Sequence, residues 1–300
     1  MKQAILITAY KDFNHLIEMI RFFDDDFYLY IHIDKKSLIS KDDIEIIQNA
    51  NNVVFLSRQF NVNWGGLNHL KSILLLSEEA IKNEDTEYFH IISGQDFPTK
   101  SCDYIQDFIT KNKGKEFLEF FEIPAKQWSD EEGGMSRIWY FNFYDFFNAK
   151  TITGQKIISF LIKIQIKLKF KRQMQQNLPK LFGGSTWWTL SYSCLKYVID
   201  YTKNKPYLLK RFKYTFASEE FFFQTIIMNS PFKDNVVNNN LRYIEWKCKN
   251  NSCPAILDDT DFDNIIVSDA IFARKFQQSI SEKLIDKIKE YITQPLKKCS

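Results

Sequence analysis

Short apolar runs alternate with amphipathic segments in the first third of the chain. Four apolar runs have the length of buried strands: residues 4–8, 28–33, 53–56 and 87–93. Between them, residues 14–23 and 67–82 repeat apolar side chains three and four positions apart, which predicts helices. Strands that alternate with helices in this way predict an α/β fold with a mostly parallel central sheet flanked by helices.

An aspartate closely follows each of two predicted strands. Asp34 follows the second strand, and Asp96 lies three residues after the strand over residues 87–93. Ligands of open α/β sheets bind beyond the carboxyl ends of the strands. We therefore expect both carboxylates at the edge of the sheet that holds the functional site.

A pair of acids opens an apolar segment later in the chain. Ser218 is placed to cap a helix, with Glu219 and Glu220 in its first turn. The buried face of this helix is predicted to hold Phe222, Phe223 and Ile226. One of the two carboxylates then points outward from a rigid helix start, where a general base is well placed. The alternative is a plain acidic first turn that favours the helix dipole.

Residues 157–172 are both apolar and strongly cationic. Phe160, Ile164 and Leu168 share one helix face, while Ile164, Ile166, Leu168 and Phe170 also alternate as a strand would, so both periods remain open. A cationic amphipathic segment suits the surface of an anionic membrane. Packing on the protein core, with the lysines left in water, explains the pattern equally well.

Composition limits the classes of function. The 300 residues are 45% hydrophobic and 26% charged, and no linker-like stretch divides them, so we expect one globular domain over residues 1–300. A net charge of +3 gives no general attraction to nucleic acid. The five cysteines are scattered, which favours reduced thiols in a cytoplasmic protein over a disulfide scaffold or a zinc site.

Five segments in sequence carry a resemblance to a known family. They are residues 31–37, 92–98, 183–191, 214–227 and 272–276. In this order and spacing the chain resembles the core-2/I-branching family of glycosyltransferases, which also holds the peptide O-xylosyltransferases. The resemblance implies the GT-A type of α/β fold and transfer of a sugar from a UDP-sugar to an acceptor hydroxyl with inversion. It also implies that no divalent metal or other cofactor is needed.

The resemblance assigns the two central roles of that chemistry. It makes Glu220 the general base for the acceptor hydroxyl, with Glu219 as the neighbouring alternative. It makes Lys275 the cation that stabilises the departing UDP. The family has a second basic residue upstream of this lysine, and residues 253–257 of this chain contain none. Candidates to replace it are Arg274, Lys249 and Lys247.

Further residues follow from the same resemblance and from the chemistry of sugar binding. The expected donor-binding residues are Asp34, Trp64, Gly65, Asp96, Arg274 and Lys275. The expected acceptor-binding residues are Gly184, Ser185, Trp187, Trp188 and Glu119. Glycines allow close approach of the backbone, aromatic rings stack on the apolar face of a pyranose, and acids accept hydrogen bonds from its hydroxyls.

The resulting hypothesis is a metal-independent transferase of N-acetylglucosamine or xylose that acts on a glycan or saccharide acceptor, in the synthesis of a bacterial surface polysaccharide or glycan. The N-terminus has too short an apolar run for a signal peptide, so we expect a cytoplasmic protein with peripheral contact to the inner face of the membrane. One rival is a non-catalytic carbohydrate-binding relative. Another is a metal-dependent transferase that uses Asp24–Asp26 or the set Asp258, Asp259 and Asp261. We interpret Asp24–Asp26 instead as a solvated turn.

Overall fold

A mostly parallel sheet forms the centre of the protein. The computed structural model describes residues 1–126, 128, 132–173 and 178–293. The sheet has the strand order β10-β6-β9-β4-β1-β2-β3. Its strands are β1 (Lys2–Ala9), β2 (Phe27–Ile33), β3 (Val53–Ser57), β4 (Thr86–Ser93), β6 (Glu116–Leu118), β9 (Trp188–Ser191) and β10 (Val236–Val237). Among these described strands β9 runs antiparallel to both of its neighbours, and the other pairs are parallel.

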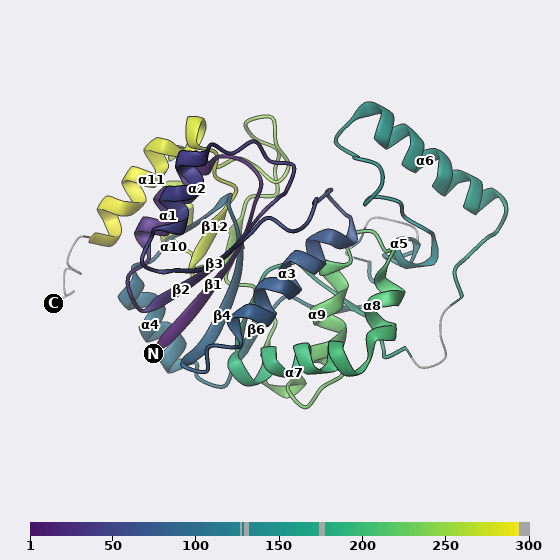
Figure 1. The fold of residues 1–300 in the computed structure, drawn as a ribbon, viewed down its shortest axis with the longest axis horizontal. Coiled ribbons are helices and arrows are strands. Elements are labelled where there is room, and N and C mark those ends of the chain that lie inside the picture. The colour runs from purple at the N-terminus through teal and green to yellow at the C-terminus, as the bar shows by residue number, and fades with distance from the viewer. Residues whose placement is uncertain (127, 129–131, 174–177, 294–300) are drawn as a thin grey trace.

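Helices cover both faces of this sheet (Figure 1). One layer holds α3 (Leu67–Ala80), α7 (Tyr192–Asn204), α8 (Pro206–Phe212) and α9 (Glu219–Met228). The other holds α1 (Phe13–Phe22), α2 (Lys41–Gln48), α4 (Cys102–Lys111), α10 (Phe262–Val267) and α11 (Gln278–Thr293). Successive side chains of a strand point to opposite faces, so Ala4 and Leu6 enter the first core while Ile5 and Ile7 enter the second. The expected α/β class is confirmed.

Two small sheets extend this framework. One contains β11 (Arg242–Ile244), β12 (Phe272–Arg274) and β5 (Asp96–Pro98), and the other contains β7 (Phe121–Glu122) and β8 (Phe182–Gly183). Strand β5 follows the carboxyl end of β4, and its antiparallel register with β12 sets Asp96 opposite Arg274. The chain also forms α5 (Ser136–Trp139), α6 (Ile152–Lys167) and the short helices η1 (Lys233–Asn235) and η2 (Asp259–Asp261).

Two points of local structure bear on the site. Strands β6 and β7 belong to different sheets, and Glu119 lies in the chain between them. The ambiguous segment 157–172 is helical as far as Lys167, so the helical period is the correct one. Among the described residues, no helix is long and apolar enough to cross a membrane.

The cysteine prediction is wrong in one place. Cys248 and Cys253 form a disulfide, with their Cα atoms 4.5 Å apart. The chain doubles back between them through a bridge of Lys249 with Ser252, which brings the two thiols together. Spacing alone did not reveal this turn. His32 and His90 are buried in the core.

Candidate active site

The first turn of α9 sends two neighbouring glutamates in different directions. Glu219 points into the protein, where its Oε1 accepts a hydrogen bond from Nδ1 of His69 (2.9 Å). Glu220 points outward, and 31% of its side-chain surface remains exposed. Consecutive helix residues lie about 100° apart, which explains the divergence. Ser218 precedes the helix as expected, but its hydroxyl makes no capping bond and is buried without a partner among the described residues.

Arg137 of α5 holds the outward carboxylate. Its Nη1 lies 2.6 Å from Oε2 of Glu220, and its guanidinium carbon lies 4.0 Å from the ring centre of Trp128 and 5.0 Å from that of Phe216. Burial raises the pKa of Glu220 to about 7, the charge of Glu219 adds to the rise, and Arg137 opposes it. The result is a carboxylate that changes its protonation near neutral pH, as a general base requires.

Trp64 and Gly65 join the same site through Phe216. The rings of Trp64 and Phe216 lie 5.1 Å apart, and Trp64 keeps 58% of its surface exposed. Gly65 has a φ of 76°, and a Cβ there would lie 2.4 Å from the Phe216 ring. Trp64 and Phe216 therefore form an aromatic wall beside Arg137, and Gly65 lets the backbone lie against it.

Asp96 and Arg274 form a buried ion pair. Nε of Arg274 donates to Oδ1 of Asp96 (3.1 Å), and Ser93 fixes the same carboxylate through its backbone N–H and its hydroxyl. The guanidinium also lies 4.2 Å above the ring of Trp187. Burial lowers the pKa of Arg274, while the charges of Asp96 and Glu220 oppose the shift. Arg274 therefore contacts Trp187 and also feels the charge of Glu220.

Lys275 lies in a group of cations. Within the described part of the chain its Nζ takes part in no ion pair or hydrogen bond. Burial lowers the pKa of Lys275 to about 8, and the charges of Arg274, Lys11 and Lys150 lower it further. Lys150 lies over the ring of Tyr10 (4.3 Å), and Lys11 contacts the same ring. Such a group is suited to bind a polyanion such as a diphosphate.

Two of the candidates named for the second basic residue lie in the loop around the disulfide. Lys249 pairs with Asp258 and Asp261, at 2.7 and 2.8 Å, so it supports its own loop. Lys247 is exposed in that loop. The carbonyl of Ala255 accepts the backbone N–H of Lys275 (3.2 Å), so a basic residue at position 255 would have lain beside this lysine. Lys11 and Lys150 supply charge at that place instead.

Asp34 shapes the loop beside these cations. Its Oδ1 accepts the backbone N–H groups of Lys36 (3.1 Å) and Val62 (3.0 Å), at the carboxyl end of β2. Its charge also acts on Lys150, whose pKa burial lowers. Asp34 and Asp96 thus lie at the same edge of the sheet, as the strand pattern predicted.

A second part of the site adjoins Glu220 through the backbone. The N–H of Gly184 donates to the carbonyl of Glu220 (2.9 Å), and a Cβ on Gly184 would lie 1.9 Å from the carbonyl oxygen of Glu119. Asn240 donates to Oγ of Ser185 (3.0 Å) and to Oε2 of Glu119 (3.3 Å). Glu119 and Asn240 line a hollow of about 380 Å³ that has room for a sugar unit.

The two tryptophans of the acceptor prediction have different surroundings. Trp188 is fully buried in β9 and packs on Phe223 (4.9 Å between ring centres), so it offers no face to a ligand. Trp187 is 5% exposed and one face is covered by Arg274. Both rings therefore support the site from within the core. The sequence predicted a stacking face here because it does not show whether an aromatic ring is buried or exposed.

The described residues contain no group of three or more histidine, cysteine or acidic side chains that is arranged for a metal ion. Asp24–Asp26 precede β2 and so lie at the amino edge of the sheet, opposite to Asp34 and Asp96. There Asp26 pairs with Lys2 (3.0 Å) in a turn. This geometry agrees with the interpretation of these aspartates as a solvated turn.

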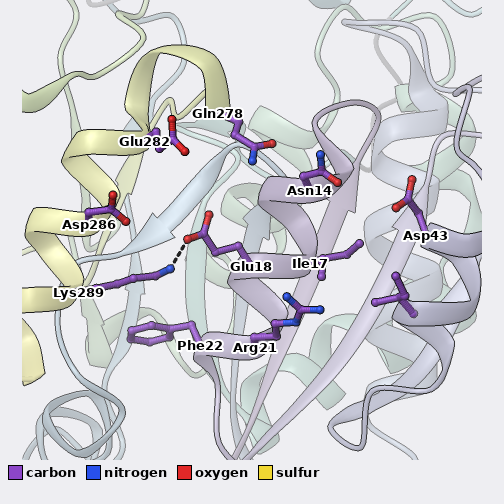
Figure 2. A pocket seen from close by; sticks show the side chains of 11 residues that line it. Asn14, Ile17, Glu18, Arg21, Phe22, Asp43, Gln278, Glu282, Asp286 and Lys289 are labelled. Atoms are coloured by element: carbon purple, nitrogen blue, oxygen red, sulfur yellow. Dashed lines mark hydrogen bonds and ion pairs between the residues drawn. The ribbon is translucent and has the colours of Figure 1, made fainter.

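A separate hollow of about 520 Å³ lies between α1, α2 and α11 (Figure 2). Glu18 of α1 pairs with Lys289 of α11 across it, and Arg21 and Asp43 point into the same space. None of the predicted site residues lines this hollow. It is a seam between helices of one layer.

Three cationic residues of the site were missed in the sequence. Arg137 lies in an aromatic segment that carried no motif, and only folding brings it to Glu220. Lys150 lies in the connection between α5 and α6. Lys11 follows β1 by two residues, so the rule that ligands bind at the carboxyl ends of strands would have found it.

The fold and this site define an α/β protein with a carboxylate of raised pKa and a group of cations at the carboxyl edge of a mostly parallel sheet. The chain belongs to the Core-2/I-Branching enzyme family, whose sequence model matches residues 4–266.

Curated relatives match nearly all of this chain but only part of their own. Xylosyltransferase 2 of Rattus norvegicus is 24% identical over 298 residues, which cover 93% of this chain and 32% of the relative. Xylosyltransferase 1 of Mus musculus is 24% identical over 307 residues, with 95% and 29% covered. The chain spans about a third of the length of these relatives.

Solved structures match more weakly. Residues 1–349 of S. aureus TarS in complex with UDP share 17% identity at a TM-score of 0.30, over 39% of this chain and 35% of that one. A putative glucose-1-phosphate thymidylyltransferase from Bacillus anthracis shares 11% identity at a TM-score of 0.30, over 72% and 85%. TM-scores this low support no argument about function.

Proposed function

We propose that the protein is an inverting, metal-independent glycosyltransferase that moves N-acetylglucosamine or xylose from a UDP-sugar to a hydroxyl of an acceptor glycan. Membership of the Core-2/I-Branching enzyme family supports the class, and xylosyltransferases are among its relatives. The observation that carries the chemistry is Glu220, an outward carboxylate with a pKa of about 7 that shares its site with Lys275 and Arg274.

Glu220 acts as the base in this proposal. Its ionised carboxylate accepts the proton of the acceptor hydroxyl while the hydroxyl oxygen attacks the anomeric carbon of the donor sugar. The bond between that carbon and the diphosphate oxygen breaks, and its electron pair leaves with UDP. A single in-line displacement needs one base and inverts the anomeric centre.

The departing UDP gains negative charge, which needs compensation. Lys275 follows Arg274 directly in the chain, and the positive charges of Lys11 and Lys150 act on the same place. Fixed cations in a site that excludes water contribute several kcal/mol, roughly, to a transition state that develops charge. Three lysines and a guanidinium therefore replace the divalent ion of a metal-dependent transferase in this proposal.

The acceptor is assigned to the hollow beside Glu119. Its walls combine the carboxylate of Glu119, the amide of Asn240 and the exposed ring of Trp246, which suit the hydroxyls and the apolar face of a sugar. Gly184 connects this hollow to the backbone of Glu220. In the cell, the acceptor would belong to a bacterial surface polysaccharide or glycan made at the cytoplasmic side of the membrane.

Thermal unfolding with a panel of nucleotide sugars tests the donor. UDP-N-acetylglucosamine and UDP-xylose are compared with GDP-mannose, each with EDTA or with manganese. A true donor stabilises by mass action, by about 2.7 kcal/mol at 100 times its dissociation constant. We expect a UDP-sugar to raise the midpoint in EDTA. Failure of every UDP-sugar, or stabilisation that requires manganese, would contradict the proposal.

Turnover is then followed as UDP release in the presence of saccharide acceptors. Release that depends on an acceptor supports the transferase. Tight binding of donor and acceptor with no release under any condition would identify a carbohydrate-binding protein without transfer activity.

A further inference from the structure

Helix α6 exposes an apolar stripe to solvent. Phe160 is 62% exposed, Ile164 38%, and Leu168, directly after the helix, 71%. Residues four apart share one helix face, so these three side chains form a continuous row. Figure 1 shows α6 standing away from the sheet and its two helix layers. An exposed row of apolar side chains usually marks a surface that binds another protein or a membrane.

The charges around this stripe all have one sign. Residues 150–172 contain six lysines and one arginine and no acidic residue. Lys156, Lys163 and Lys167 lie along one ridge of α6, next to the stripe. In the described part of the chain these three ammonium groups have no hydrogen bond or ion pair. The surface is therefore both apolar and uncompensated in charge.

Contacts on the opposite side fix the helix in this orientation. Gln165 is buried, accepts the backbone N–H of Phe141 (2.8 Å) and donates to the carbonyl of the same residue (3.1 Å). Gly154 packs so closely that a Cβ there would lie 2.1 Å from the carbonyl oxygen of Asn148. The stripe thus faces outward because the other face of α6 is already used.

We propose that the stripe and the lysine ridge form a docking surface for an anionic phospholipid bilayer. Apolar side chains enter the boundary between headgroups and acyl chains, while the lysines pair with lipid phosphates. A second copy of the chain fits less well, because it would bring an identical lysine ridge against the first. Anionic lipid complements the charge that a second copy would repel.

Sedimentation with vesicles tests this surface on the whole chain, independently of any transfer activity. Vesicles of equal parts phosphatidylglycerol and phosphatidylcholine are compared with vesicles of phosphatidylcholine, at 50 and 500 mM NaCl. We expect the protein to sediment with the anionic vesicles at low salt and to be released largely at high salt, since salt screens the attraction.

Two triple variants distinguish the lysines of α6 from the overall positive charge of the protein. Lys156→Gln, Lys163→Gln and Lys167→Gln together should weaken binding by about 100-fold, because each lysine contributes about 1 kcal/mol at an anionic surface. The matched control is Lys41→Gln, Lys111→Gln and Lys203→Gln, which removes the same charge from exposed lysines on other helices. The control should bind within about threefold of the parent protein.

A third variant tests the apolar stripe. The double variant Phe160→Ser and Ile164→Ser should weaken vesicle binding roughly tenfold or more, because less apolar surface is buried in the bilayer. Equal sedimentation with both kinds of vesicle, or equal losses in the two lysine triples, would overturn the proposal. A lipid-free dimer that the serine variant dissociates, without any preference for anionic vesicles, would overturn it in favour of a second copy.

Discussion

Arg137 and Glu220 form an ion pair of 2.6 Å at the start of α9, with the guanidinium held against the rings of Trp128 and Phe216. The two rings fix the cation without neutralising it. Burial nevertheless raises the pKa of the carboxylate to about 7, so the desolvation of Glu220 outweighs the attraction of its partner. A carboxyl with this balance exchanges its proton near neutral pH, which suits a general base.

Glu220→Gln should remove transfer and leave UDP binding near normal. Loss of a general base costs about 10²- to 10⁴-fold in rate. The melting temperature at pH 8 should not fall, because the ionised carboxylate is destabilising there. Its folded pKa lies above the ordinary 4.5, so the stability that it contributes is full below that value and lost as pH rises through about 7.

Glu219→Gln is the matched control for this prediction. Glu219 faces His69 inside the protein, so we expect a loss of less than about tenfold in rate. Steady-state rates and UDP titrations of both variants decide the matter. An inactive Glu219 variant together with an active Glu220 variant would show that Glu219, and not Glu220, is the base.

The pH dependence of kcat/KM should be bell-shaped. Below about pH 7 Glu220 is protonated and accepts no proton, so the rate rises as pH increases through 7. Above about pH 8 Lys275 loses its charge, so the rate falls again. Rates measured from pH 5 to 10 check both limbs.

Two variants assign those limbs. Arg137→Gln removes a group that lowers the pKa of Glu220, so the acid limb should move to higher pH. Lys275→Ala should abolish the alkaline limb. An acid limb that stays in place without Arg137 would show that another group titrates there.

The strand pattern was enough to predict the edge of the sheet that holds the site. Asp34 and Asp96 follow strands in sequence, and parallel strands end at the same edge. Local helix geometry also predicted that one of the two glutamates points outward, and the family resemblance selected Glu220. These features depend on spacing along the chain, which a sequence displays directly.

The remainder depends on contacts between distant segments. Arg137 meets Glu220 across 83 positions, and Lys150 reaches Lys275 from the connection before α6. The Cys248–Cys253 disulfide depends on a turn through Asn250 and Asn251, both at positive φ, which bring the two cysteines together. Trp188 looked like a binding residue because sequence does not distinguish a buried ring from an exposed one.

Trp64 and Trp188 should respond differently to substitution by alanine. Trp188→Ala should destabilise the fold by about 3 to 5 kcal/mol, because a fully buried ring leaves a cavity. Trp64→Ala should change the melting temperature little, since the ring is mostly exposed, and should weaken donor binding. Denaturant unfolding and UDP-sugar titration measure the two effects. Equal destabilisation by both changes would contradict the assignment of Trp64 to the site.

Lys275→Ala should reduce the rate of transfer far more than it weakens acceptor binding. The charge on departing UDP grows toward the transition state, so a cation beside the diphosphate acts mainly on kcat. Lys11→Ala and Lys150→Ala should give intermediate losses, because both lysines act on the same region. Lys247→Ala is the matched control: this lysine is exposed just before Cys248, and its loss should leave the rate unchanged.

Chelation completes the test of this cation group. If Lys275, Lys11 and Lys150 replace a divalent ion, the parent protein keeps its full rate in excess EDTA, and manganese rescues none of the lysine variants. The reason is that an ammonium group positioned by the fold needs no ion to supply the charge. Activity that disappears in EDTA and returns with manganese would instead require a metal site, and the lysines would then have a supporting role in donor binding.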